Sequence, residues 1–117
     1  MGKNIGQLYS VVIAQSASAS EELGPEDLRD ADGLCIYLPA TMTGTAVEVE
    51  VSFDGSTWFS LQTGISSTTD TPYAEAPGEA LQIGTVNFPY LRLLSNGTEA
   101  AARTIYVTKG VIDSRLV

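Results

Sequence analysis

Glu48 and Glu50 are the side chains whose type and spacing come nearest to a reaction centre. Two residues apart on one strand, their carboxyl groups would face the same side about 7 Å apart, near the separation that glycosidases use. The same spacing arises wherever a half-buried strand turns its polar side to water. Because Val47, Val49 and Val51 alternate with these glutamates, we interpret the pair as solvent-facing.

A second acidic group offers the oxygen ligands that Ca²⁺ prefers. It comprises Glu26, Asp27, Asp30 and Asp32. Its spacing, D-L-R-D-A-D-G, departs by one residue from the D-x-D-x-D-G order of a calcium loop. We therefore interpret these residues as an acidic surface loop and predict no metal site.

The chain contains no histidine. This removes Ser-His-Asp and Cys-His catalysis, imidazole acid-base chemistry and nearly every zinc site. Neither G-x-G-x-x-G nor a Walker glycine loop occurs, so phosphate binding has no support. We expect a protein that is not an enzyme and that uses no cofactor.

Fourteen acidic residues against six basic ones give a formal charge of −8. Most of such a surface repels a polyanion such as DNA. No run approaches the ~18 apolar residues that cross a bilayer, and the first residues lack the apolar segment of a signal peptide. We expect synthesis in a cytoplasm and binding to neither nucleic acid nor membrane.

The elements that position these side chains are β-strands. The first strand is predicted over Thr45 to Phe53, where apolar and polar residues alternate from Val47 up to an Asp54-Gly55 turn, and Trp58 to Gln62 supplies the return strand. The pattern predicts an antiparallel hairpin with Phe53 on the core side.

Five other segments have the composition of strands. Leu34 to Leu38 is predicted to be buried along its whole length, with Cys35 as a small core residue. In Gln7 to Ala14 either Leu8 and Val12 or Val11 and Ile13 face the core. The remaining three are Ala80 to Ile83, Tyr90 to Ser95 and Arg103 to Thr108.

Four connecting segments leave their structure open. Ser16 to Ser20 either loops or joins a sheet edge, and the acidic residues after Pro25 form a short helical turn or a surface loop. Thr63 to Gly78 is a long polar loop, of a length that is functional or disordered in compact domains. Val111 to Val117 is a last strand or a carboxy-terminal arm.

Together these patterns predict an all-β fold. About eight short strands separated by turns are typical of an antiparallel β-sandwich with jelly-roll character. At 117 residues the chain suits a single domain over 1–117, with residues 1–8 and 111–117 as candidate arms.

Two aromatic residues and two arginines are candidates for contacts. Trp58 is a sugar-stacking platform or, as we favour, an anchor of its hairpin. Tyr73, the only large apolar residue of the long loop, is an exposed contact or a lid over one end of the sandwich. Arg92 and Arg103 are expected to pair with nearby carboxylates.

The chain resembles small β-sandwich proteins encoded among the structural genes of tailed bacteriophages. The resemblance rests on S-F-D-G-S-T-W at Ser52 to Trp58, F-P-Y-L-R-L-L-S-N-G-T at Phe88 to Thr98 and A-A-R-T-I-Y-V at Ala101 to Val107. It implies a capsid cement or decoration protein on the virion exterior. Such a protein binds the major capsid protein and forms a homo-oligomer, for which the resemblance suggests a trimer.

This resemblance makes the chain ends and the long loop the expected partner-binding regions. Rigid sandwiches that clamp a shell need apolar anchors near loop ends and arms. The candidate partner-binding residues are Ile5, Leu8, Tyr73, Val111, Ile112 and Leu116.

The chain is also similar to discoidin-like, galactose-binding jelly rolls. The shared elements are the S-x-D-G-x-x-W hairpin and the later Tyr90 to Leu93 strand, but the chain is shorter and lacks that family's cysteine pair. This resemblance implies a carbohydrate-binding or tail-associated adhesion module that holds a glycan with Trp58 and Tyr73. A head–tail connector or tail component would share the same fold.

Overall fold

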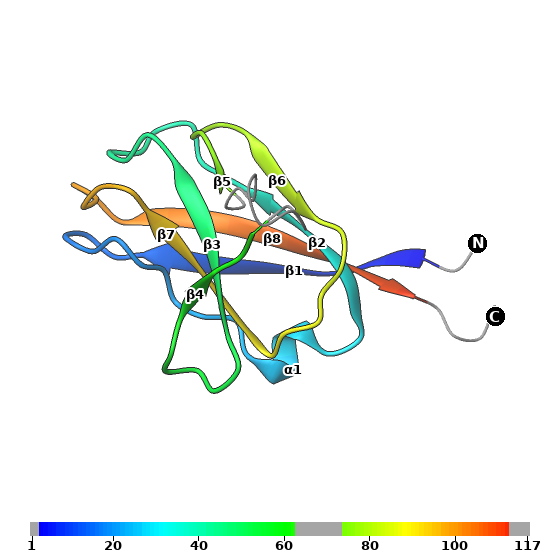
Figure 1. The fold of residues 1–117 in the computed structure, drawn as a ribbon. Helices are drawn as coiled ribbons and strands as arrows, with labels where there is room; N and C mark the ends of the chain where they lie inside the picture. The colour runs from blue at the N-terminus through cyan, green and yellow to red at the C-terminus, as the bar shows by residue number, and fades with distance from the viewer. Residues whose placement is uncertain (1–2, 63–73, 113–117) are drawn as a thin grey trace.

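The computed structural model describes residues 3–62 and 74–112. Within these residues it contains eight strands and one short helix (Figure 1). The elements are β1 (Lys3–Ile13), α1 (Pro25–Leu28), β2 (Ala31–Tyr37), β3 (Val47–Ser52), β4 (Phe59–Ser60), β5 (Ala74–Glu75), β6 (Ala80–Ile83), β7 (Tyr90–Ser95) and β8 (Arg103–Ile112).

Sheet A contains the strands in the order β1-β8-β2-β6, all antiparallel to their neighbours. The predicted bounds of β6 are confirmed, whereas β1 and β8 are longer than predicted. They pair from Lys3 opposite Ile112 to Ile13 opposite Arg103, with a bulge between Ile5 and Leu8. Lys3 and Ile112 therefore lie at the same end of the sandwich, where β8 extends past β6 and is paired with β2 as far as Ala31 opposite Val111 (Figure 1).

Sheet B is built around β3. β7 pairs with one edge of β3, and the short strands β4 and β5 pair with successive parts of the other edge. This arrangement confirms the predicted hairpin and the predicted bounds of β7. The chain passes repeatedly from one sheet to the other, at β2–β3, β5–β6, β6–β7 and β7–β8, as in a jelly roll. The prediction of an all-β antiparallel sandwich with jelly-roll character is confirmed.

The small polar run after β1 joins the edge of sheet B. Ser20 and Leu23 donate backbone N–H groups to the carbonyls of Leu93 and Leu91 in β7, and Ser95 donates to Ser18. These bonds satisfy backbone groups of β7 that its partner β3 does not reach. Of the two alternatives for Ser16 to Ser20, the sheet edge is correct.

The core lies between the two sheets and consists of aliphatic side chains. Burying each one contributes about 1.5–3 kcal/mol. Val11 and Ile13 are buried, which decides the register of β1. The buried aliphatic residues are Val11, Ile13, Leu23, Leu28, Leu34, Ile36, Leu38, Val47, Val49, Leu81, Ile83, Leu91, Leu93, Ile105 and Val107.

Of the two alternatives for the acidic residues after Pro25, the helical turn is correct and forms α1. Asp27 accepts a hydrogen bond from the backbone N–H of Gly24, which caps the turn. Lys109 of β8 is buried, and its ammonium donates to the carbonyls of Asp27 and Arg29 at 3.0 and 2.9 Å. The acidic segment is thereby attached to sheet A.

Two predictions about side-chain orientation are wrong. β2 is not buried along its length: Leu34, Ile36 and Leu38 point inward, whereas Cys35 is half-buried and Tyr37 is exposed on the outer side. Phe53 is 68% exposed rather than in the core, since Ser52 takes the inward position at the end of β3.

Candidate functional site

The outward side of sheet A differs from the rest of the surface because its side chains are uncharged. Strands alternate inward and outward positions, and the inward ones are set by the buried residues of each strand. Within residues 8–12, 33–37, 80–84 and 104–110, the outward residues are Leu8, Ser10, Val12, Gly33, Cys35, Tyr37, Ala80, Gln82, Gly84, Thr104, Tyr106, Thr108 and Gly110. We call this surface the sheet-A face.

Two tyrosines stand side by side on the sheet-A face. Tyr37 of β2 is directly opposite Tyr106 of β8. They are 43% and 49% exposed, and the Tyr37 hydroxyl lies 3.1 Å from the Thr108 hydroxyl, which holds its ring in place. Exposed tyrosines with one fixed end are typical of protein contact surfaces.

A hollow of about 230 Å³ lies four residues further along the same strands. Its lining includes three glycines, Gly33, Gly84 and Gly110, together with Cys35 and Thr108. Gly33 is required by packing, because a Cβ there would lie 2.8 Å from the Ile83 carbonyl oxygen. The missing side chains leave space on an otherwise flat sheet.

The predicted partner-binding residues fall into three groups. Leu8 is 64% exposed on the sheet-A face. Ile5, Val111 and Ile112 lie in the paired ends of β1 and β8, where Ile5 is opposite Gly110. Tyr73 and Leu116 lie outside the described residues. The structure thus places Ile5, Val111 and Ile112 at one end of sheet A, whereas Leu8 lies opposite Thr108, level with the middle of β2.

The outward side of sheet B carries charged residues that are paired. Arg92 of β7 donates to the Glu50 carboxylate at 2.7 Å, and Ser60 donates to Glu48. The guanidinium of Arg92 also lies 4.4 Å from the ring centre of half-buried Trp58. Glu48 and Glu50 are therefore engaged separately, and the prediction that Arg92 pairs with a carboxylate is confirmed.

The tip of the β3–β4 hairpin presents two exposed phenylalanines. Phe53 and the 51% exposed Phe59 stack with ring centres 6.0 Å apart. The turn between them is organised by Asp54, whose pKa falls to about 2 because the backbone N–H groups of Thr57 and Ser56 donate to its carboxylate. The hairpin therefore displays its aromatic pair on an ordered turn.

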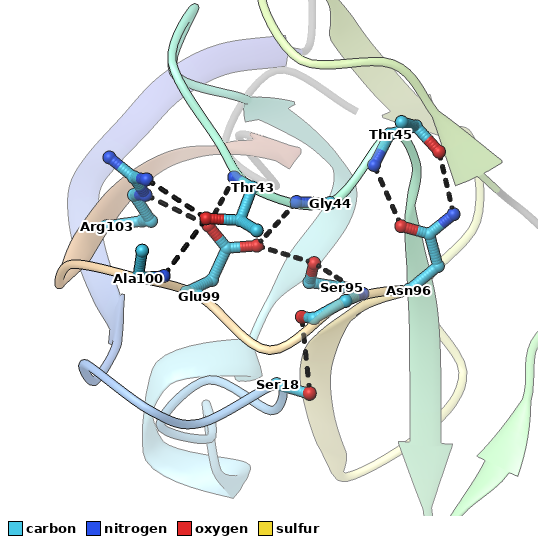
Figure 2. Close-up of polar contacts among 10 residues, drawn as sticks. Ser18, Thr43, Gly44, Thr45, Ser95, Asn96, Glu99, Ala100 and Arg103 are labelled. Atoms are coloured by element: carbon cyan, nitrogen blue, oxygen red, sulfur yellow. Dashed lines mark hydrogen bonds and ion pairs between the residues drawn. The ribbon is translucent and has the colours of Figure 1, made fainter.

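Glu99 is a buried carboxylate beside Arg103, at the end of sheet A where β8 begins (Figure 2). It accepts hydrogen bonds from the backbone N–H groups of Thr43 and Gly44, the Ser95 hydroxyl and Arg103, all within 3.0 Å. Burial alone would raise its pKa, but these donors outweigh burial and lower the pKa to about 2. We call these five residues the Glu99 clasp.

The Glu99 clasp is a structural device that sequence reasoning missed. It joins the β7–β8 connection to the segment before β3, and Asn96 strengthens the junction by bonding Thr45 through both its oxygen and its nitrogen (Figure 2). The predicted pairing of Arg103 with a carboxylate is confirmed. The four-residue spacing from Glu99 to Arg103 was the available signal.

Neither a metal-binding cluster nor a membrane-spanning helix is present among the residues that the structure describes. Those residues contain no cluster of three or more His, Cys, Asp or Glu side chains able to hold a metal ion. No helix there is long and apolar enough to cross a membrane.

No protein-family model and no curated protein sequence matches the chain. Its fold is similar to that of the SPBc2 prophage-derived protein YomS, with 10% sequence identity and a TM-score of 0.60 over 89% of this chain and 93% of that one. A chain from the disulfide-linked pili of Bacillus endospore appendages is 13% identical, with a TM-score of 0.51 over 96% and 91%. CBM32-3, from a family 31 glycoside hydrolase of Clostridium perfringens, is 18% identical, with a TM-score of 0.48 over 88% and 74%. At these identities the likeness concerns the fold.

Proposed function

We propose that this chain is a non-enzymatic structural protein of a bacteriophage virion. It is made in the host cytoplasm, binds the outside of the assembled capsid and bridges neighbouring copies of the major capsid protein. The fold that it shares with a prophage-derived protein and with a pilus chain supports a structural role.

The paired ends of β1 and β8 are the observation that carries the proposal. They lie at one end of sheet A (Figure 1), where Ile5 is opposite Gly110 and Val111 is opposite Ala31 of β2, and Ile112 lies one residue beyond. Exposed Leu8 lies further in, opposite Thr108. An extended strand pair of this kind can add to a partner's sheet, while its apolar side chains fill pockets. Tyr73 and Leu116 are further proposed contacts.

The charge of the chain is consistent with an exterior position. A formal charge of −8 is repelled by DNA packed inside a shell and is compatible with solvent outside it. A cement protein stabilises the shell by mass action, because its contacts must be lost before the subunits separate.

Co-sedimentation with expanded capsids that lack the protein tests this proposal, followed by heating the shells with and without it. We expect saturable binding and a higher disruption temperature. A chain truncated after Gly110 should lose binding, whereas the matched truncation after Ile112 should keep most of it. Absence of binding by the intact chain would contradict the proposal.

A carbohydrate-binding or tail-associated adhesion role is the second candidate. The exposed Phe53–Phe59 stack favours it, because exposed aromatic faces suit saccharide rings. Trp58 could offer a sugar only the ring face that the Arg92 guanidinium does not cover. Tyr73 would complete such a site. Binding on a glycan array that Phe59→Ala abolishes, without capsid binding, would establish this role instead.

A further inference from the structure

The sheet-A face has a knob and a hole at matched positions. Tyr37 and Tyr106 form one cross-strand pair, and Gly33 and Gly110 form another four residues away in both strands. The two pairs are separated by about 13 Å. Midway between them, Cys35 is opposite Thr108, so the face has a tyrosine row, a central row and a glycine row.

The tyrosine row and the glycine row are equally far from the central row, so two copies of the face can pack against each other. A two-fold axis along the central row, parallel to the face, reverses the strand direction of the second copy. Tyr37 of one copy then lies over Gly33 of the other, and Tyr106 lies over Gly110. We infer that the sheet-A face is the docking surface for a second copy of this chain, with Tyr106 of each copy entering the hollow of the other, while Tyr37, held by Thr108 of its own chain, lies along the face and packs against the central row.

The distribution of charge favours a second copy as the occupant. Two chains of charge −8 repel each other, and a two-fold contact places every residue of a patch against the same patch. The outward side of sheet B would oppose Glu48 and Glu50 to their copies. On the sheet-A face no carboxylate among the outward positions of residues 8–12, 33–37, 80–84 and 104–110 meets another.

The size of the face sets the expected affinity. Four strands about 4.8 Å apart, each with about six residues at about 3.3 Å, make a face of roughly 19 by 20 Å. Two such faces have an area of roughly 760 Å² in total, which is below the ~1,200 Å² of stable specific interfaces and in the range of weak, transient ones. We therefore expect a dimer that dissociates on dilution, rather than the trimer that the phage resemblance suggested.

The dimer would give the bridging role a geometry. Since the two-fold axis reverses the strands, the paired ends of β1 and β8 point in opposite directions from the two copies. Each dimer then presents one docking end to each of two capsid subunits. This last step rests on the proposed function, whereas the dimer itself does not.

Sedimentation velocity over a range of concentrations tests the dimer. We expect the mass to rise from the 12.4 kDa of one chain to twice that value. Tyr106→Lys should weaken the dimer at least about tenfold, although it lowers the net negative charge and so reduces general repulsion. Phe53→Lys is the matched control, because it makes the same change at an exposed aromatic away from the face.

A second variant fills the hole instead of removing the knob. A Cβ at Gly84 meets no atom within 4 Å, so Gly84→Leu should fold normally while its side chain occupies the hollow. We expect it to weaken the dimer as Tyr106→Lys does, with an unchanged circular dichroism spectrum.

Cross-linking through the one cysteine tests the position of the axis. Facing sheets lie about 10 Å apart, too far for a disulfide, but a short bis-maleimide can join the Cys35 thiols of the two copies. We expect a covalent dimer with the natural chain and none with Cys35→Ser. The yield should fall with Tyr106→Lys and persist with Phe53→Lys.

A monomer at millimolar concentration, a trimer, or a dimer that Tyr106→Lys and Gly84→Leu leave intact would overturn the inference. Capsid co-sedimentation reports separately on the proposed function. If the chain dimerises but does not bind shells, the dimer is supported and the capsid role is contradicted. If it binds shells as a monomer, the capsid role is supported and the dimer is contradicted.

Discussion

The two ends of β8 differ in charge and in hydrogen bonding. At its start Arg103 belongs to the Glu99 clasp. There the buried Glu99 carboxylate accepts hydrogen bonds from Arg103 and from the backbone N–H groups of Thr43 and Gly44. At its end Gly110 lines an uncharged hollow that no side chain of the described residues fills. β8 thus connects a buried charged group, whose hydrogen-bonding capacity is used within the chain, to an uncharged hollow on the surface.

This difference separates stability from recognition. Donors and acceptors of the clasp are used up within the chain, so it has little capacity for a ligand and acts as a fastening between loops. The hollow and the neighbouring tyrosines contribute little to the core and leave apolar surface for a partner. We therefore expect substitutions in the clasp to affect unfolding and substitutions at the hollow to affect association.

Glu99→Ala should give the largest loss of stability. It leaves Arg103 without its buried partner and removes the acceptor of two backbone N–H groups, for an expected loss of about 3–5 kcal/mol in the free energy of unfolding. Urea denaturation measures this loss. Glu48→Ala, on the outward side of sheet B, is the control and should lose less than about 1 kcal/mol; equal losses would contradict the role of the clasp.

Acid should weaken the clasp before it affects the sheet-A face. The pKa of Glu99 is lowered in the folded chain from an ordinary 4.5 to about 2, so its contribution is complete above pH 4.5 and is lost as the pH falls toward 2. The difference corresponds to at most ~3 kcal/mol. Glu99→Gln should remove this part of the pH dependence. Asp54, whose pKa is also lowered, should leave a residual dependence in both proteins.

Gly33→Ala should have an intermediate effect at the hollow itself. Its Cβ would press on the Ile83 carbonyl, which costs about 1–3 kcal/mol. Gly84→Ala, in open space on the same wall, should change the free energy of unfolding by less than about 0.5 kcal/mol. A similar cost for both variants in thermal unfolding would show that close packing of the backbone does not shape the hollow.

Arg92→Ala should have the smallest effect. The ion pair with Glu50 and the contact with Trp58 are partly exposed, and each is worth about 1 kcal/mol or less. Unfolding followed by tryptophan fluorescence measures this change. If Arg92→Ala lowered the free energy of unfolding as much as Glu99→Ala, the buried Arg103–Glu99 pair would not differ in stability from the partly exposed Arg92–Glu50 pair.

Strand positions were predictable because alternation of apolar and polar residues is local. Ala80–Ile83 and Tyr90–Ser95 are correct at both ends for this reason. Phe53 was assigned to the core by extending the alternation one residue too far. Ser52 ends the pattern because its hydroxyl accepts the backbone N–H groups of Asp54 and Gly55, which turns the chain.

The sheet-A face and most of the Glu99 clasp could not be predicted from the sequence because they depend on register and on contacts between distant segments; only the Glu99–Arg103 pair has a local signal, its four-residue spacing. The clasp joins Thr43 to Glu99, 56 residues apart. The matched rows of tyrosine and glycine exist only once β2 and β8 are aligned. A run such as Leu34 to Leu38 also appears uniformly apolar, since cysteine and tyrosine occur both in cores and on contact surfaces.

The common exit of the two chain ends also determines how the protein responds to mechanical load. A force that pulls the termini apart acts on the last rung of the β1–β8 ladder, Lys3 opposite Ile112, and opens the rungs one after another. A force between the termini and the loops of the Glu99 clasp instead runs along the strands and must break many hydrogen bonds together. The molecule should therefore unzip easily when it is stretched between its two ends and resist strongly when it is stretched along its length.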